Sequence, residues 1–273
     1  MHVAEHTITL GDAPVFFRTA TPEAAQPSDE APVVFVHGAP TSSDDWTAFL
    51  DRLGGIAPDL IGFGRTSKAA NLDYSPEGLA EFLDGFLTEL KVDQLKLVLH
   101  GWGAAAGVLL AAQDPSRVDR LVLINPLPLL EGARWPWWVR VWRRRGVGEL
   151  AMGFISRMVL ARGLRRGSAS PDAWSPQRIG QVWEQFDQGT QRAILRLTRS
   201  IDDERVQRMA EALRSLDLPS LVVWGERDPW WGPEVAETYS SLLPRARLVR
   251  LPGAGHWPWL DDPSVVDLVA SFL

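Results

Sequence analysis

Short, almost continuously apolar runs recur along this chain, and they constrain its fold more than any other feature. Each has the length of a strand, and an uninterrupted apolar run is typical of a parallel strand buried on both faces of its sheet. The runs are VVFVHG (33–38), KLVLH (96–100), RLVLIN (120–125), SLVVWG (220–225) and ARLVRL (246–251). Amphipathic helices are expected between them, so the order predicts a doubly wound α/β sheet.

Two features complete this sheet and its helices. HTITL (6–10) and PVFFRTA (14–20) predict an antiparallel start to the sheet. One helix is expected to begin at Ser75, because serine is a favoured cap and Pro76 suits the first helical turn.

Residues 126 to 212 break the strand rhythm, which resumes near residue 219. This stretch is rich in tryptophan and arginine and has the spacing of helices rather than strands. We therefore predict a core formed by residues 1–125 and 213–273, with a helical cap formed by residues 126–212. Such a cap is expected over the carboxyl edge of the sheet, where ligands bind in open α/β folds.

Composition excludes several classes of function. A net charge of −6 gives no long-range attraction to nucleic acid, and the absence of cysteine excludes disulfides and thiolate chemistry. No run approaches the roughly 20 apolar residues that a membrane span requires, and the first residues lack a signal-peptide pattern. We expect a cytoplasmic protein, a monomer or homodimer, with no stable membrane insertion and no nucleic-acid partner.

The stretch KLVLHGWGAAAG (96–107) carries the most specific pattern: an apolar strand, a tight turn and a helix of small residues. That shape is typical of a nucleophile elbow, which presents a reactive side chain at the tip of the turn. Gly101 occupies the tip and has no side chain. Asp228 follows one later strand and His256 the next, and nucleophile, acid and histidine in this order match an α/β-hydrolase triad.

With FVHGAPTSSDDW (35–46) and IAPDLIGFGRTSK (56–68) added, the chain resembles the α/β-hydrolase superfamily over almost its whole length outside the cap. It is most similar to haloalkane dehalogenases and epoxide hydrolases, which have approximately VVHDWGSALG at the elbow. Their aspartate nucleophile is replaced by Gly101, whereas His100, Trp102 and Gly103 match.

The resemblance implies an eight-stranded, mostly parallel sheet and hydrolysis of a small apolar substrate through an aspartyl ester, without cofactor or metal. His256 is then the base that activates water, and Asp228 orients it. The backbone N–H groups of Ala39 and Trp102 stabilise the oxyanion, and the Trp102 indole corresponds to a halide donor. Without a nucleophile at position 101, the chain is expected to be inactive or strongly impaired by this route.

The sequence departs from both families elsewhere. Ala39 stands where dehalogenases often supply a second halide donor, an asparagine. Epoxide hydrolases use tyrosines of the cap, but Tyr74 and Tyr239 both lie outside it. Candidate substrate-pocket residues are His37, Trp138, Trp142, Trp183 and Phe186.

Three functions therefore stay open: an impaired hydrolase, a non-catalytic ligand-binding protein, and a cofactor-free lyase or cyclase that uses His256 as base. The cap adds one further question. Nine arginines and a single acid, Glu149, lie between residues 134 and 166. They indicate either a solvated helix face or attraction to an anionic substrate or a lipid surface.

Overall fold

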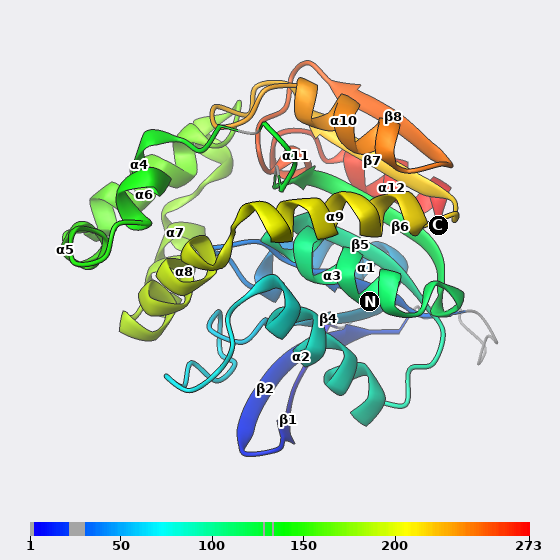
Figure 1. The fold of residues 1–273 in the computed structure, drawn as a ribbon, viewed down its shortest axis with the longest axis horizontal. Helices are drawn as coiled ribbons and strands as arrows, with labels where there is room; N and C mark the ends of the chain where they lie inside the picture. The colour runs from blue at the N-terminus through cyan, green and yellow to red at the C-terminus, as the bar shows by residue number, and fades with distance from the viewer. Residues whose placement is uncertain (1–2, 22–30, 128, 133) are drawn as a thin grey trace.

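One sheet of eight strands runs through the molecule in the order β1-β2-β4-β3-β5-β6-β7-β8 (Figure 1). The structure is a computed structural model that describes residues 3–21, 31–127, 129–132 and 134–273. β1 pairs with β2, and β2 with β4, in antiparallel fashion, whereas the remaining neighbours are parallel. The strands are β1 (Ala4–Leu10), β2 (Ala13–Ala20), β3 (Val33–Val36), β4 (Gly55–Pro58), β5 (Leu95–Gly101), β6 (Val118–Pro126), β7 (Ser220–Gly225) and β8 (Ala246–Leu251). The predicted eight-stranded, mostly parallel sheet with an antiparallel start is confirmed.

The central strands β3, β5, β6 and β7 form the buried middle of the sheet, as their apolar runs predict. Leu97, Val122 and Val222, from three neighbouring strands, have no exposed surface. β4 contains a glycine and a proline in only four residues, so it lacks such a run. Because β5, β6 and β7 are parallel, their carboxyl ends meet at one edge of the sheet.

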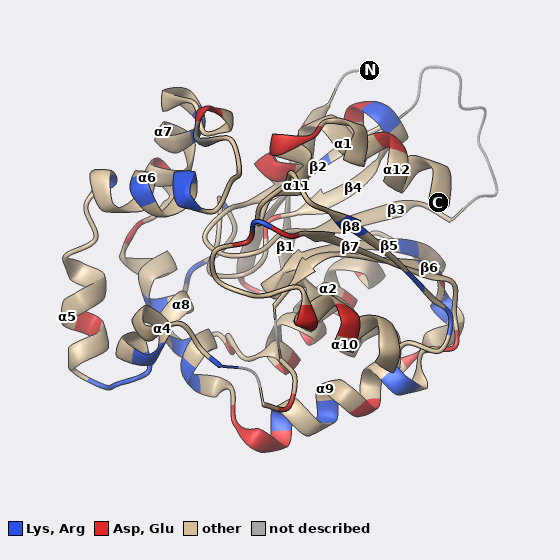
Figure 2. Cartoon of the chain, turned by 90° about the horizontal axis from the view of Figure 1, so that it is seen from above, with Lys and Arg blue, Asp and Glu red and all other residues tan. Residues whose placement is uncertain are grey.

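Helices cover both faces of the sheet. Figure 2 shows α1 and α12 on one side, and α2, α9 and α10 on the other. α3 contacts both α2 and α9, so it belongs to the second layer. Ser75 caps α2 as predicted, since its hydroxyl accepts the N–H of Gly78 at 3.2 Å. These helices are α1 (Thr47–Leu53), α2 (Pro76–Glu89), α3 (Trp102–Gln113), α10 (Glu234–Leu242), α11 (Pro258–Asp261) and α12 (Ser264–Phe272).

The described residues of the segment between β6 and β7 form helices joined by loops and turns, with no strand among them. Its helices are α4 (Trp137–Trp142), α5 (Val147–Gly153), α6 (Arg157–Arg166), α7 (Pro176–Gln185), α8 (Gln188–Ser200) and α9 (Asp203–Ser215). α4 to α8 gather at one end of the molecule (Figure 1). α9 instead packs against α3, and the predicted boundary at residue 212 falls inside it. The division into core and cap stays a prediction.

None of the helices in the described ranges combines the length and the apolar character that crossing a bilayer requires.

Candidate active site

Gly101 lies at the sharp turn between β5 and α3. Its φ of 53° and ψ of −121° are values that residues with side chains adopt only under strain. A Cβ atom at this position would lie 3.8 Å from Nε2 of His256 and 3.4 Å from Cα of Gly38, which is ordinary van der Waals contact. Position 101 therefore faces the His256 imidazole, with space for a side chain but a backbone that favours glycine.

Gly103, two residues beyond the turn, has a different physical reason to be glycine. A Cβ atom there would approach the carbonyl oxygens of Val36 and His37 to 2.5 Å, far inside van der Waals contact. The first turn of α3 can pack against the end of β3 only because no side chain intervenes. The small residue that the elbow pattern places here is thus a packing requirement.

His256 and Asp228 form a buried hydrogen-bonded pair at the same edge of the sheet. Nδ1 of His256 lies 2.6 Å from Oδ2 of Asp228, and the residues are only 4% and 8% exposed. Oδ2 also accepts the Asn125 amide at 3.0 Å, and Oδ1 accepts the N–H of Trp230 at 2.9 Å. Because the Asp228 carboxylate accepts all three bonds, the His256 ring carries its proton on Nδ1. The lone pair of Nε2 then faces Gly101.

Asn125 is a site residue that the sequence analysis did not identify. It ends the apolar run of β6, has an unusual φ of 38° and is completely buried. Besides its bond to Asp228, its Oδ1 accepts the N–H of Gly225 at 2.8 Å. The available signal was an amide side chain at the end of an otherwise apolar strand, next to the edge where the site was expected.

His100 contacts the backbone of His256. Its Nε2 lies 2.9 Å from the carbonyl oxygen of His256, and the two rings are 4.7 Å apart. Burial, followed by the nearby His256, holds the pKa of His100 well below its usual value. A neutral ring that donates from Nε2 matches this contact, so His100 fixes the loop that carries His256.

The loop after β3 carries His37, Gly38, Ala39 and Pro40, with a cis Ala39–Pro40 peptide bond. His37 is completely buried, and burial lowers its pKa. Its Nδ1 donates to the carbonyl of Gly38 at 2.8 Å, and its Nε2 accepts the N–H of Leu60 at 2.9 Å. Both ring nitrogens are therefore used within the protein, and the structure gives His37 the position of a scaffold residue.

The two N–H groups predicted to stabilise an oxyanion come from this loop and from the turn. Ala39 follows Gly38, whose Cα lies beside position 101, and Trp102 is the first residue of α3. The first N–H groups of a helix have no acceptor within it, so the Trp102 N–H is free to face a ligand. The Trp102 ring stacks on Trp135 with centroids 6.1 Å apart.

The predicted aromatic pocket residues fall into two groups. Trp142 contacts Trp138 at 4.6 Å between centroids, Trp138 contacts Trp230 at 6.2 Å, and Trp230 contacts His256 at 4.8 Å. This row of rings leads from α4 to the imidazole, and the sequence analysis did not identify Trp230 as part of it. The other two predicted residues, Trp183 and Phe186, pair with each other at 6.3 Å, and no ring contact among the described residues joins them to the row.

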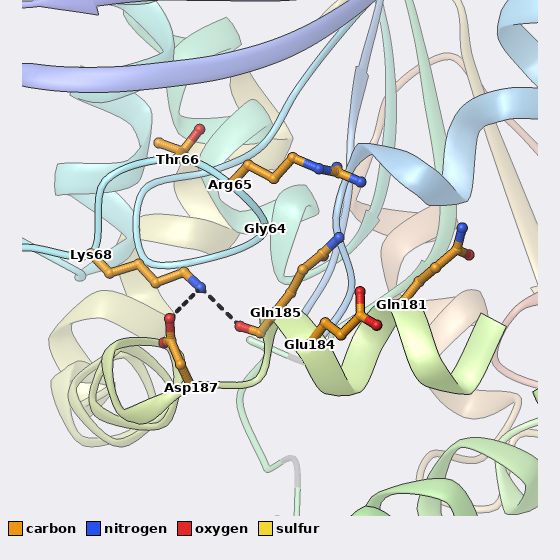
Figure 3. A pocket seen from close by; sticks show the side chains of 8 residues that line it. All are labelled: Gly64, Arg65, Thr66, Lys68, Gln181, Glu184, Gln185 and Asp187. Carbon is orange, nitrogen blue, oxygen red and sulfur yellow. Dashed lines mark hydrogen bonds and ion pairs between the residues drawn. The ribbon is translucent and has the colours of Figure 1, made fainter. Parts of the chain in front are cut away.

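A polar hollow of about 530 Å³ lies elsewhere, between the loop after β4 and α7 (Figure 3). It is lined by Gly64, Arg65, Thr66, Lys68, Gln181, Glu184, Gln185 and Asp187. Lys68 is held by the Gln185 carbonyl at 2.8 Å and the Asp187 carboxylate at 2.9 Å. None of Gly101, Asp228 and His256 lines the hollow, and its polar walls do not suit the small apolar substrate that the sequence predicts.

No group of three or more histidine or acidic side chains in the described part of the chain is arranged to hold a metal ion.

The structure brings Gly101, Asp228 and His256 together, with Ala39 and Trp102 beside them. The chemical roles assigned to these residues stay predictions.

Comparison with known proteins agrees with this architecture. The family model described as alpha/beta hydrolase fold matches residues 31–263. A haloalkane dehalogenase of Bradyrhizobium diazoefficiens is 30% identical, over 88% of this chain and 86% of its own length. A cis-3-alkyl-4-alkyloxetan-2-one decarboxylase of Xanthomonas campestris is 28% identical, over 90% of this chain and 89% of its own.

Among solved structures, the epoxide hydrolase CorEH superposes with a TM-score of 0.84 at 20% identity, covering 99% of this chain and 98% of that one. At this identity the similarity speaks for the fold alone. The match of the family model over most of the sequence, on an eight-stranded sheet with this edge, means that the chain belongs to the alpha/beta hydrolase fold family.

Proposed function

We propose that this protein is a hydrolase of the haloalkane dehalogenase and epoxide hydrolase type in which the aspartyl-ester route is blocked at Gly101. The observation that carries the proposal is the empty side-chain position 3.8 Å from Nε2 of His256, a ring whose other nitrogen is held by buried Asp228 at 2.6 Å. An ester intermediate needs a carboxylate at that position, and glycine supplies none.

The base side of the proposed machinery is complete without the nucleophile. Nε2 of His256 accepts a proton from water, and the Asp228 carboxylate stabilises the resulting imidazolium through Nδ1–H. In an enzyme with an aspartate at position 101, this water would hydrolyse the ester, and the N–H groups of Ala39 and Trp102 would stabilise the oxyanion.

Within this branch, the residues favour haloalkanes over epoxides as the ancestral substrate. Opening an epoxide calls for a phenol donor from the cap. Both tyrosines are buried outside it and donate to backbone carbonyls: Tyr74 to Ala69 and Tyr239 to Leu127, each at 2.6 Å. Trp102 keeps its position as a halide donor, and the apolar tryptophan row suits a small apolar ligand.

A second function is supported by the intact His256–Asp228 pair: a cofactor-free lyase or cyclase in which His256 removes a proton from the ligand itself. The relative named as a decarboxylase supports chemistry other than hydrolysis on a similar chain. A protein that only binds ligand would not need the pair. His256→Ala separates the two, because it should abolish base catalysis and leave ligand binding within a few-fold.

Gly101→Asp tests the main proposal. We expect this variant to release halide from short haloalkanes, whereas Gly101→Ala, which carries the same backbone strain but no carboxylate, should not. In Gly101→Asp/His256→Ala the ester should form and persist, so intact-mass spectrometry should show the protein heavier by the alkyl group. A folded Gly101→Asp that neither turns over haloalkanes, epoxides or simple esters nor acquires this mass contradicts the proposal.

A further inference from the structure

The outer surface of α4, α5 and α6 exposes large apolar side chains to solvent. Every large apolar residue that is strongly exposed in the described part of the chain lies between residues 137 and 159. They are Trp137 (73% exposed), Val147 (51%), Leu150 (67%), Phe154 (80%), Met158 (80%) and Val159 (53%), here called the apolar patch. Monomeric soluble proteins rarely gather such residues on one surface without a partner, so the patch indicates a docking face.

Arginines lie on the same stretch of chain as the apolar patch. Of the nine arginines between residues 134 and 166, all except Arg143 are exposed, and none forms an ion pair with another described residue. Arg143 is turned inward, where it donates to the carbonyls of Thr198 and Ile201. The single acid, Glu149, is held by both terminal nitrogens of Arg199, at 2.6 and 2.8 Å. Residues 134–166 therefore present eight exposed arginines, and their single acid is already paired with Arg199.

The net positive charge of residues 134–166 contrasts with the net negative charge of the rest of the chain. Residues 134–166 carry nine arginines and one glutamate, while the whole chain has a net charge of −6, so the remaining residues hold a net −14. Arginines lie on α4, on α6 and in the turn between α4 and α5 (Figure 2). In both ribbon views α5 lies at the outer limit of the molecule, where a flat partner can reach it.

From this combination we infer that the face formed by α4, α5 and α6 docks on a lipid bilayer that contains anionic lipids. Apolar side chains on short helices enter the boundary between headgroups and acyl chains, and arginines beside them meet the lipid phosphates. A guanidinium binds phosphate with two parallel N–H bonds, which suits the eight exposed arginines. A second copy of the chain fits less well, because a symmetric contact would bring the same unpaired arginines face to face.

Flotation of the full chain with vesicles tests this inference. Vesicles of phosphatidylcholine mixed with phosphatidylglycerol should bind the protein at least about tenfold more tightly than phosphatidylcholine alone, because the attraction is to anionic headgroups. Raising the salt concentration should weaken this binding, since the exposed charges are screened.

Two variants separate the charged and apolar contributions. Arg144→Glu/Arg145→Glu reverses two exposed charges, and Phe154→Ser/Met158→Ser removes the two most exposed apolar side chains. Each should lower vesicle affinity about tenfold or more. The matched control, Arg245→Glu/Arg247→Glu, makes the same charge change on exposed arginines at the start of β8 and should stay within about twofold of the native chain.

All of these substitutions are at exposed positions, so unchanged melting temperatures should accompany them. The inference is overturned if the native chain does not bind anionic vesicles, or if both patch variants bind as well as the native chain. It is also overturned if the native chain self-associates without binding vesicles and the patch variants are monomeric, because the face then docks on a second copy.

Discussion

The two sides of the site differ in how completely they are built. On the base side, the Asp228 carboxylate accepts hydrogen bonds from His256, Asn125 and Trp230, and the backbone of His256 is fixed by His100. On the facing side, Gly101 contributes a left-handed turn and an open space instead of a reactive group. The contrast teaches that, in the proposed hydrolase, orientation and reactivity would be carried by different residues, so that one substitution could alter reactivity without disturbing orientation.

The largest expected effect comes from breaking the base side. In a Gly101→Asp background, Asp228→Asn should lower turnover by about 10³ to 10⁴-fold, because an amide no longer holds the imidazole in the tautomer that leaves Nε2 free. Asparagine also keeps only one side-chain oxygen. If its NH₂ group takes the place of Oδ1, the N–H of Trp230 loses its acceptor. Steady-state halide release measures the effect.

Intact-mass spectrometry on the same double variant sharpens this prediction. Loss of the base slows ester hydrolysis rather than ester formation, so the alkylated protein should accumulate during turnover. Turnover within tenfold of the Gly101→Asp parent would show that Asp228 is not the residue that orients His256.

The sequence predicted the fold and the facing residues of this site for identifiable physical reasons. Strand runs and the elbow spacing are local patterns, so Gly101, Asp228 and His256 could be assigned to strand ends that parallel pairing brings together. Asn125 was missed because its role depends on a contact with Asp228, 103 residues away, that no local pattern encodes.

The predicted pocket residues mark the limit of the same reasoning. His37 lies in the loop beside the site, but its ring is turned into the protein by bonds to Gly38 and Leu60. Composition could nominate the tryptophans of the cap, yet only three-dimensional packing puts Trp138 one ring from Trp230 and leaves Trp183 with Phe186. In loops and in the segment between β6 and β7, the direction of a side chain depends on tertiary contacts, which the spacing of residues in the sequence does not reveal.

Asp45, in the short 3₁₀ helix Ser43–Trp46 that follows the loop after β3, is a buried acid whose protonation should affect stability. Burial raises the pKa of Asp45 to about 7, against a smaller opposing effect of the hydrogen bond with Thr41. The Thr41 hydroxyl lies 2.5 Å from Oδ2 of Asp45 and 3.0 Å from the carbonyl of Gly38. A hydroxyl has one proton, so a protonated Asp45 that donates to Thr41, which in turn donates to Gly38, satisfies both contacts.

Asp45→Asn should therefore change how stability depends on pH. In the native chain the folded-state pKa of about 7 exceeds an unfolded value of about 3.9, so stability is full below about pH 4 and falls until about pH 7. The loss is at most about 4 kcal/mol, at about 1.4 kcal/mol per pH unit. Asparagine keeps a donor for Thr41 and cannot ionise, so the variant should be the more stable protein at pH 8.

Urea denaturation from pH 4 to pH 8 measures this difference. Asp51→Asn, a matched change at an exposed position on α1, should leave the pH dependence of the native chain unaltered. If Asp45→Asn and the native chain lose stability in parallel across this range, then Asp45 is not protonated in the folded protein.

Asn125→Ala tests whether the base side depends on its buried amide. It removes the acceptor of the Gly225 N–H and one donor to Asp228, and a buried polar group left unpaired costs about 1–3 kcal/mol. The free energy of unfolding should fall by that amount. In the Gly101→Asp background, kcat should fall while the pH profile shifts, which a purely structural role would not cause. An unchanged pH profile would confine Asn125 to packing.

The smallest effect is expected from Gly101→Ala, which isolates backbone strain from chemistry. The methyl group meets only ordinary contacts, at 3.4 Å from Gly38 and 3.8 Å from His256, so steric overlap should add nothing. The φ of 53° should still cost about 1–2 kcal/mol relative to glycine. Urea denaturation of Gly101→Ala and Gly101→Asp should then give nearly equal losses, because both carry the same strained backbone. A markedly larger loss for aspartate would mean that a carboxylate is unfavourable beside His256. Glycine would then be favoured at position 101 by the surroundings of the side chain as well as by the backbone angles.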